Sequence, residues 1–199
     1  HATHRRSVTP VEVKDAWLRQ ADHPELVEYI FGLDEDDPTS LEQTDGHPRV
    51  VSPPSDGVTA VRNWNAAAAA SSGDLLVVVA DDLFPRPHWD TSLRSVVARL
   101  DPRTDAFAIK VSESGEAGRQ DLLRHPVVSR AFYERLSLFS PAFTGVYCDD
   151  DITVRAMTRA AIIDARHVRW EHRHPSNDAG VTASASQSRI NSPEEYARG

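Results

Sequence analysis

Apolar positions along the chain recur with helix spacing in some segments and as short β-branched runs in others. Residues 10–21 repeat apolar side chains at helical spacing, and Thr9 with Glu12 forms a capping box that places Pro10 at the first helical position. Helix spacing also predicts helices over residues 58–72, 89–100, 127–136 and 149–160. Apolar runs predict strands over residues 27–33, 49–52, 74–80, 106–111 and 162–170. This alternation of strands and helices indicates an α/β fold with a mainly parallel sheet.

The composition bounds the size and class of the fold. The chain has 199 residues with 40% hydrophobic and 26% charged content. That is enough for one sizeable core and too little for two comfortable domains, so we expect one domain over residues 1–175. Residues 176–199 are rich in Ser, Ala, Asn and Asp, which is typical of a flexible C-terminal tail or lid.

The net charge and cysteine content exclude some classes of function. A formal charge of −8 argues against general nucleic-acid binding, which needs a basic face to displace counterions. The one cysteine, Cys148, cannot form an intrachain disulfide, and no apolar run approaches the ~20 residues of a membrane span. With no signal-peptide pattern either, we expect a cytoplasmic protein.

The predicted strand at 74–80 ends in two carboxylates. Residues 77–79 are all valine, as in a strand covered on both faces, and Asp81 and Asp82 follow it. Ligands of open α/β sheets bind beyond the carboxyl ends of such strands, and hard divalent cations prefer oxygen ligands. The pair therefore suits a metal and a diphosphate. A solvated turn before Pro85 explains the same residues equally well.

From Arg62 to Asp90 the chain resembles the nucleotide-sugar-binding half of GT-A glycosyltransferases, especially family 2. There, an Arg-Asn-x-x helix with an Ala/Gly-rich end and a Gly-Asp leads to a strand and an Asp-x-Asp. In this chain the first carboxylate of that motif is replaced by Val79. The resemblance implies that Asp81 occupies the metal-holding position, with Asp82 as the alternative ligand.

This resemblance implies a single GT-A domain, a Rossmann-like α/β fold whose mainly parallel mixed sheet is flanked by helices. The implied activity is that of an inverting, metal-dependent glycosyltransferase of the hexosyltransferase type with Mn²⁺ or Mg²⁺ as cofactor. It would transfer a sugar from a nucleoside-diphosphate sugar, with UDP favoured, to a hydroxyl of a glycan, protein or small molecule.

Asp149, Asp150 and Asp151 stand at the start of the predicted helix at 149–160, where the helix dipole stabilises carboxylates. Family 2 enzymes often carry Glu-Asp-x-Asp-Leu-x-x-x-Arg in this region, and residues 148–155, Cys-Asp-Asp-Asp-Ile-Thr-Val-Arg, resemble that motif. The resemblance implies that Asp149 is the catalytic base, acting on the acceptor hydroxyl. Because Cys148 replaces the usual Glu, Asp150 and Asp151 stay open as alternatives.

His172 and His174 alternate at the end of the last predicted strand, so their side chains point the same way. Two exposed histidines are the simpler interpretation. GT-A enzymes commonly place a His after the last core strand to complete the ligand set of the cation. The resemblance therefore implies metal binding by one of the two, and it favours His172 over His174.

The resemblance gives five candidate residues for contacts with the nucleotide. Residues 1–6, HATHRR, resemble the loop after the first GT-A strand that touches the base and ribose. The implied contacts are Thr3 and Arg5 from this loop, Asp34 or Asp36 to the base, and Arg62 to the base or diphosphate. Solvated charges and an exposed helix arginine are the alternatives for the last three.

Two other functions remain open. Val79 in place of the first motif aspartate is also compatible with a GT-A-like nucleotide-binding module that has no catalytic activity. A sugar nucleotidyltransferase is disfavoured because residues 1–10 contain no glycine, whereas such enzymes carry a Gly-rich basic loop after the first strand. No G-x-G-x-x-G follows any predicted strand, which argues against a dehydrogenase.

Overall fold

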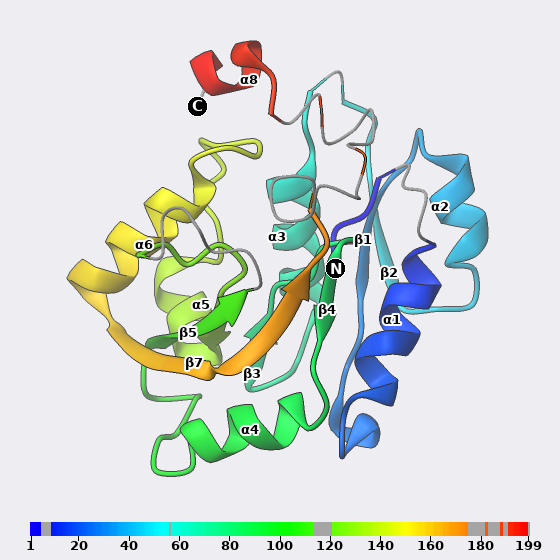
Figure 1. Cartoon of the computed structure of the whole chain (residues 1–199). Coiled ribbons are helices and arrows are strands. Elements are labelled where there is room, and N and C mark those ends of the chain that lie inside the picture. Colours follow the sequence, from blue (N-terminus) through cyan, green and yellow to red (C-terminus); the bar gives the residue numbers. More distant parts are fainter. Residues whose placement is uncertain are drawn as a thin grey trace.

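The computed structural model describes residues 1–4, 9–55, 57–113, 121–174, 182, 188 and 191–198. It has a mixed α/β architecture in which helices flank a curled sheet (Figure 1). The helices are α1 (Pro10–Arg19), η1 (Pro24–Leu26), α2 (Pro38–Gln43), α3 (Ala60–Ala70), α4 (Trp89–Val96), α5 (Arg130–Leu136), α6 (Cys148–Arg159) and α8 (Pro193–Arg198). The strands are β1 (Phe31–Asp34), β2 (Arg49–Ser52), β3 (Leu75–Val77), β4 (Leu83–Pro85), β5 (Phe107–Glu113), β6 (Val127–Ser129) and β7 (Ala161–His172).

The described strands form two sheets. β1 and β2 pair in parallel, and the second sheet has the order β3-β6-β5-β7-β4. Within it β5 and β7 are parallel, whereas β3–β6, β5–β6 and β4–β7 are antiparallel. The predicted mixed sheet is thus present, but antiparallel pairs outnumber parallel ones among these strands. The alternation of helices and strands along the sequence indicates which segments are strands, but it does not specify whether two paired strands run parallel or antiparallel.

Several predicted elements are confirmed with small shifts in their ends. α1 has the expected capping box, in which the Thr9 hydroxyl accepts from the backbone of Glu12. β2, α4, β5, α6 and β7 also occur where the pattern places them. α3 begins after Thr59, later than the sequence suggested. The local rules of capping and periodicity are therefore sufficient for most of the elements.

The predicted helix over residues 127–136 is wrong in its first turn. Val127 and Val128 belong to β6, and the helix starts only after Ser129, whose hydroxyl accepts from the backbone of Phe132 at 3.1 Å. β-branched residues favour a strand, and serine favours the N-cap position, so the residues agree with the observed break. The short elements α2 and β4 were not predicted.

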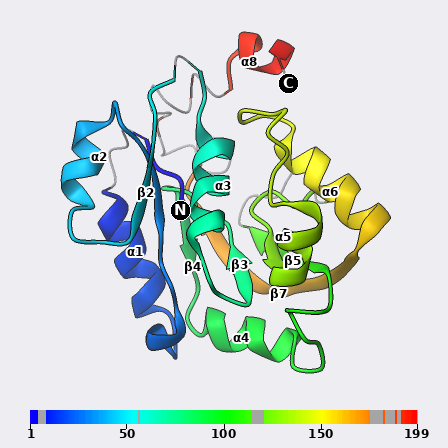
Figure 2. The same ribbon diagram turned by 180° about the vertical axis from the view of Figure 1, so that it is seen from behind.

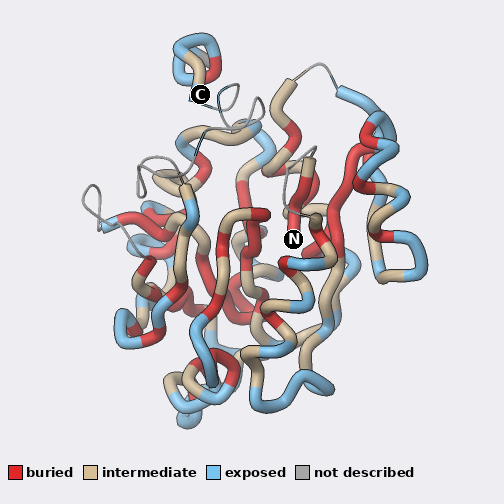
Figure 3. Tube along the Cα trace, turned by 45° about the vertical axis from the view of Figure 1, so that its right-hand side comes forward, coloured by how far each residue is buried: buried red, intermediate tan, exposed pale blue. Residues whose placement is uncertain are grey.

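The core lies on both faces of the five-stranded sheet. Alternate residues of β5 point to opposite sides, so Phe107 and Ile109 join one cluster while Ala108 joins the other. The first cluster packs against α1 and α4 and contains Trp17, whose ring lies 5.3 Å from that of Trp170. The second cluster packs against α3, α5 and α6, which lie on the side of the molecule that Figure 2 shows. Buried positions accordingly gather along the central strands (Figure 3).

Gly32 allows α3 to lie directly against β1. A Cβ at this position would be only 2.2 Å from the backbone oxygen of Asn63. The close approach brings Arg62 and Asn63 to Asp34, at the carboxyl end of β1. The absence of a side chain at Gly32 thus allows the polar cluster around Asp34 to form.

No helix within the described segments is long and apolar enough to cross a membrane.

Candidate functional site

Chemically reactive side chains meet at one edge of the five-stranded sheet. β5 and β7 run in parallel, with Glu113 in register with Trp170, so their carboxyl ends lie together. β6 is antiparallel to β5, which brings its amino end, preceded by His125, to the same edge. Asp81 and Asp82 follow β3 and precede β4, whose Leu83 pairs with His172. The topology therefore gathers residues from four segments.

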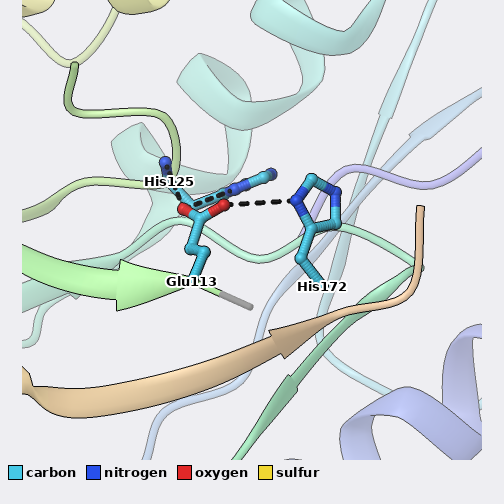
Figure 4. Close-up of side chains that lie close together, drawn as sticks. All are labelled: Glu113, His125 and His172. Atoms are coloured by element: carbon cyan, nitrogen blue, oxygen red, sulfur yellow. Dashed lines mark hydrogen bonds and ion pairs between the residues drawn. The ribbon is translucent and has the colours of Figure 1, made fainter. Parts of the chain in front are cut away.

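Glu113 lies between two imidazoles (Figure 4). One carboxylate oxygen is 3.0 Å from Nδ1 of His125 and also accepts from the His125 backbone at 3.3 Å. The other is 3.2 Å from Nδ1 of His172. Burial alone would raise the pKa of Glu113, but the two histidines outweigh it and hold the pKa well below its usual range. Glu113 is therefore a buried carboxylate anion.

His172 contacts carboxylates through both ring nitrogens. Its Nδ1 faces Glu113, and its Nε2 is 3.6 Å from an oxygen of Asp82. Burial acts to lower the pKa of His172, but Asp82 and Glu113 reverse the effect and raise the pKa to about 9. The ring of His174 lies 5.4 Å from that of His172, as the alternation along the strand predicts.

The two aspartates of the predicted metal position have different contacts. Asp81 is buried and bonded to Nε2 of His1 at 2.9 Å, while Tyr29 contacts Nδ1 of the same imidazole at 2.8 Å. Asp82 is the member of the pair that contacts His172. The structure thus brings Asp82 and His172 together, and it connects Asp81 to the first residue of the chain.

Asp34 accepts hydrogen bonds from four side chains. One oxygen accepts from Arg62 at 2.6 Å and Asn63 at 3.0 Å, and the other from Thr59 at 2.5 Å, with His4 Nδ1 at 3.1 Å. Burial would raise the pKa of Asp34, but these hydrogen bonds outweigh it and hold the pKa far below the usual range. The Arg62 side chain keeps 37% of its surface exposed and that of His4 keeps 29%, so Arg62 is the most exposed donor to Asp34.

The other predicted nucleotide contacts are dispersed. Thr3 is buried beside β1, where its backbone donates to Gly32, and its hydroxyl has no hydrogen-bond partner among the described residues. Asp36 is exposed in the turn after β1. Arg5 lies outside the described residues. Asp34 and Arg62 are in direct contact with each other.

The three aspartates at the start of α6 differ from one another. Burial and the charge of Asp150 raise the pKa of Asp149, although the nearby His125 partly opposes them. Asp151 pairs with Arg155 at 2.7 Å, and that guanidinium also donates to the backbone of Leu138. Asp151 is therefore part of a structural anchor, and Asp149 is the aspartate with the raised basicity that a proton acceptor needs.

Two residues of the site, Glu113 and His125, were missed by sequence reasoning. Glu113 lies two residues after the predicted strand at 106–111, and His125 lies two residues before the predicted helix at 127–136. A cue was available for Glu113, because strand ends in α/β sheets attract ligands. None was available for His125, since only the antiparallel pairing of β6 brings it to this edge.

A large cavity adjoins the contact between His1 and Asp81, because His1 and Tyr29 are among its lining residues. It has a volume of about 550 Å³ between residues 26–30 and β3, and much of its lining is apolar. None of the candidate catalytic, nucleotide-binding or metal-binding residues lines it. The side-chain chemistry, and not this cavity, therefore identifies the candidate site.

Comparisons with solved structures identify the fold. TarS from S. aureus (residues 1–349), in complex with UDP-GlcNAc, aligns with a TM-score of 0.62 at 12% identity over 99% of this chain and 67% of that one. The mannosyltransferase PcManGT from Pyrobaculum calidifontis, in complex with GDP-Man and Mn²⁺, aligns with a TM-score of 0.57 at 17% identity over 86% of this chain and 55% of that one. No protein-family model and no curated protein matches the sequence. The chain has a GT-A-like glycosyltransferase fold, as predicted.

Proposed function

We propose that this chain is a metal-dependent glycosyltransferase that transfers a sugar from a nucleoside-diphosphate sugar, with UDP favoured, to an acceptor hydroxyl with inversion. The observation that carries the proposal is the convergence of Asp82, Glu113 and His172 at the carboxyl edge of the sheet, where ligands of α/β folds bind. Carboxylates and imidazoles are the donor types that a Mn²⁺ or Mg²⁺ site uses, so the residues fit such a cation.

The donor would be held from both halves of the fold. The nucleotide contacts are assigned to Thr3, Arg5, Asp34, Asp36 and Arg62, and the cation contacts to Asp81, Asp82, His172 and His174. Because both oxygens of Asp34 already accept hydrogen bonds, Arg62 is the member of that cluster best able to reach a phosphate or base. A bound divalent cation would neutralise the charge that develops on the departing diphosphate.

Asp149 would act on the acceptor. Its carboxylate takes the proton from the acceptor hydroxyl as that oxygen attacks the anomeric carbon, and Asp150 is the alternative base. The raised pKa of Asp149 supports this role, because a more basic carboxylate accepts a proton more readily. Attack from the side opposite the diphosphate gives the inverted product.

The comparisons support a nucleotide-sugar donor without specifying it. One similar structure holds UDP-GlcNAc and another holds GDP-Man with Mn²⁺, so both bases belong in the test. Thermal unfolding should be recorded with UDP-, GDP- and dTDP-sugars, with and without Mn²⁺. A ligand that binds only the folded state raises the apparent stability by RT ln(1 + [L]/Kd). Absence of any metal-dependent stabilisation and of any donor turnover would contradict the proposal.

One observation favours a second candidate, a nucleotide-binding module without catalytic activity. Val79, which replaces the first aspartate of the motif, is buried in the core cluster, so no carboxylate reaches the site from that position. Donor hydrolysis separates the two functions. A chain that is stabilised by UDP and Mn²⁺ but turns over no sugar nucleotide is the module.

The Asp81→Asn and Asp82→Asn variants test which of the two aspartates holds the cation. The family resemblance implies that Asp81→Asn loses more metal-dependent nucleotide binding than Asp82→Asn does. The contact between Asp82 and His172 favours the reverse order. Calorimetric titration of each variant with UDP in the presence of Mn²⁺ decides between them.

A further inference from the structure

Three side chains of metal-ligand type come from three neighbouring strand ends. Glu113 ends β5, His172 ends β7, and His125 lies just before β6. Their ligand atoms all lie within 4.8 Å of one another. The exposed side-chain fractions are 3% for Glu113, 10% for His125 and 13% for His172. The cluster is therefore preformed, and its geometry does not depend on mobile surface side chains.

The spacing suits a small transition-metal ion. Ligands at about 2.0–2.2 Å in a tetrahedral arrangement lie roughly 3.4 Å from each other. The Glu113 oxygens are 3.0 and 3.2 Å from the two Nδ1 atoms, so small adjustments would open room for an ion. One carboxylate and two imidazoles also form a common three-residue ligand set that leaves a fourth position open.

The aspartate pair is less well arranged for the same task. Val79 supplies no ligand, and Asp81 is bonded to His1. Asp82 faces Nε2 of His172, on the opposite side of the ring from Glu113. A metal-bound imidazole usually donates its other N–H to a carboxylate, which fixes the ring. Asp82 is placed to accept that hydrogen bond.

We propose that Glu113, His125 and His172 together bind one transition-metal ion, through a carboxylate oxygen of Glu113 and Nδ1 of each histidine. In this arrangement Asp82 lies outside the ligand set and orients His172, in place of the ligand role that the family resemblance implies for it. Two imidazole ligands select Zn²⁺ or Mn²⁺ over Mg²⁺, because nitrogen donors suit transition metals better than magnesium. The site stands on its own geometry, and only its use as the cation of sugar transfer rests on the proposed function.

Calorimetric titration of the chelator-treated chain with ZnCl₂, MnCl₂ and MgCl₂ tests the ligand set. Glu113→Gln and His125→Asn should each weaken Zn²⁺ and Mn²⁺ binding at least tenfold. The amide of His125→Asn still donates to Glu113, which helps to preserve the fold. His88→Asn, at an exposed histidine paired with Asp22, is the matched control for adventitious binding.

An unaltered chain provides a test that does not depend on variants folding. With ¹⁵N-labelled histidine, Zn²⁺ should shift the Nδ1 resonances of His125 and His172 and leave Nε2 of His172 protonated. A shift of Nε2 of His172 with His125 unchanged would place the ion beside the aspartates and overturn the proposal. The same holds for a His125→Asn variant that binds Zn²⁺ as tightly as the parent.

The outcomes separate this site from the proposed activity. Zn²⁺ ligation by the two Nδ1 atoms without any binding or turnover of sugar nucleotides supports the metal site and contradicts the glycosyltransferase. Metal-dependent sugar transfer together with ligation through Nε2 of His172 supports the glycosyltransferase and contradicts the proposed metal site. A chain that binds none of the three ions, or whose Zn²⁺ binding is weakened by His88→Asn as much as by His125→Asn, overturns the metal site.

Discussion

Asp34 and Glu113 are two buried carboxylates with depressed pKa values, but their partners differ. Asp34, at the end of β1, is surrounded by Arg62, Asn63 and Thr59 together with His4. Glu113, at the end of β5, is in contact with the imidazoles of His125 and His172. Both clusters neutralise a carboxylate that would otherwise be costly to bury.

The difference lies in whether the partners can lose their protons. Three of the four donors around Asp34 are a guanidinium, an amide and a hydroxyl, which keep their hydrogens at any ordinary pH, and only the fourth, His4, is an imidazole. An imidazole can release its proton and then coordinate a cation, and because the pKa of His172 is raised to about 9, a cation must displace that proton at neutral pH. The Asp34 cluster therefore joins β1 to α3 mainly through donors of fixed protonation, whereas the Glu113 cluster combines a carboxylate with two imidazoles, the groups of the proposed metal site.

The largest expected effect lies outside both clusters, at Asp149. We expect Asp149→Asn to reduce transfer by 10²–10⁴-fold, the usual contribution of a general base, and to change donor affinity only a few-fold. Steady-state transfer with the true acceptor and calorimetry with the donor measure the two quantities. Equal transfer rates in parent and variant would move the role to Asp150.

The Glu113 cluster should lose its stabilising effect at alkaline pH in the metal-free chain. The folded pKa of His172, about 9, exceeds the unfolded value of 6.5, so its contribution is complete below pH 6.5 and disappears as the pH rises through 9. A shift of this size corresponds to about 3 kcal/mol at most. Urea unfolding between pH 6 and 10 should show this decline in the parent and not in His172→Asn. A decline of the same size in both would contradict the assignment.

Gly32→Ala should disrupt the Asp34 cluster through packing. A methyl group there would meet the backbone of Asn63 at 2.2 Å, so α3 must move away from β1. Overpacking of this kind typically costs about 1–3 kcal/mol of unfolding free energy. Gly73→Ala is the matched control, because its nearest contact is an ordinary 3.5 Å. Unfolding curves that coincide for the two variants would show that the contact is not tight.

The smallest effect expected is at acid pH. The depressed pKa of Asp34 means that its contribution is present above about pH 4 and is lost as the pH falls toward the folded value. We expect Asp34→Asn to reduce the decline in unfolding free energy between pH 4 and 2 only in part, because the pKa of Glu113 is also depressed. Unfolding curves of the parent, Asp34→Asn and Glu113→Gln resolve the two contributions.

The sequence by itself determined the features that depend on neighbouring residues. The capping box of α1, the helix after Cys148 and the long strand to His172 follow from periodicity and caps. The carboxylates at 81 and 82 were also recognisable as a strand-end pair. These features are local, so the information needed to predict them lies within a few residues.

Only the tertiary structure decided which of these residues meet. Asp82 and His172 are far apart in sequence and come together because β4 pairs with β7. Glu113 and His125 join them because β6 turns back along β5, a pairing direction that the hydrophobic pattern does not encode. Asp81 contacts His1 because the chain start lies beside β1. Long-range strand pairing depends on the packing of the whole sheet, and for that reason the ligand set of the candidate site could not be predicted from the local pattern.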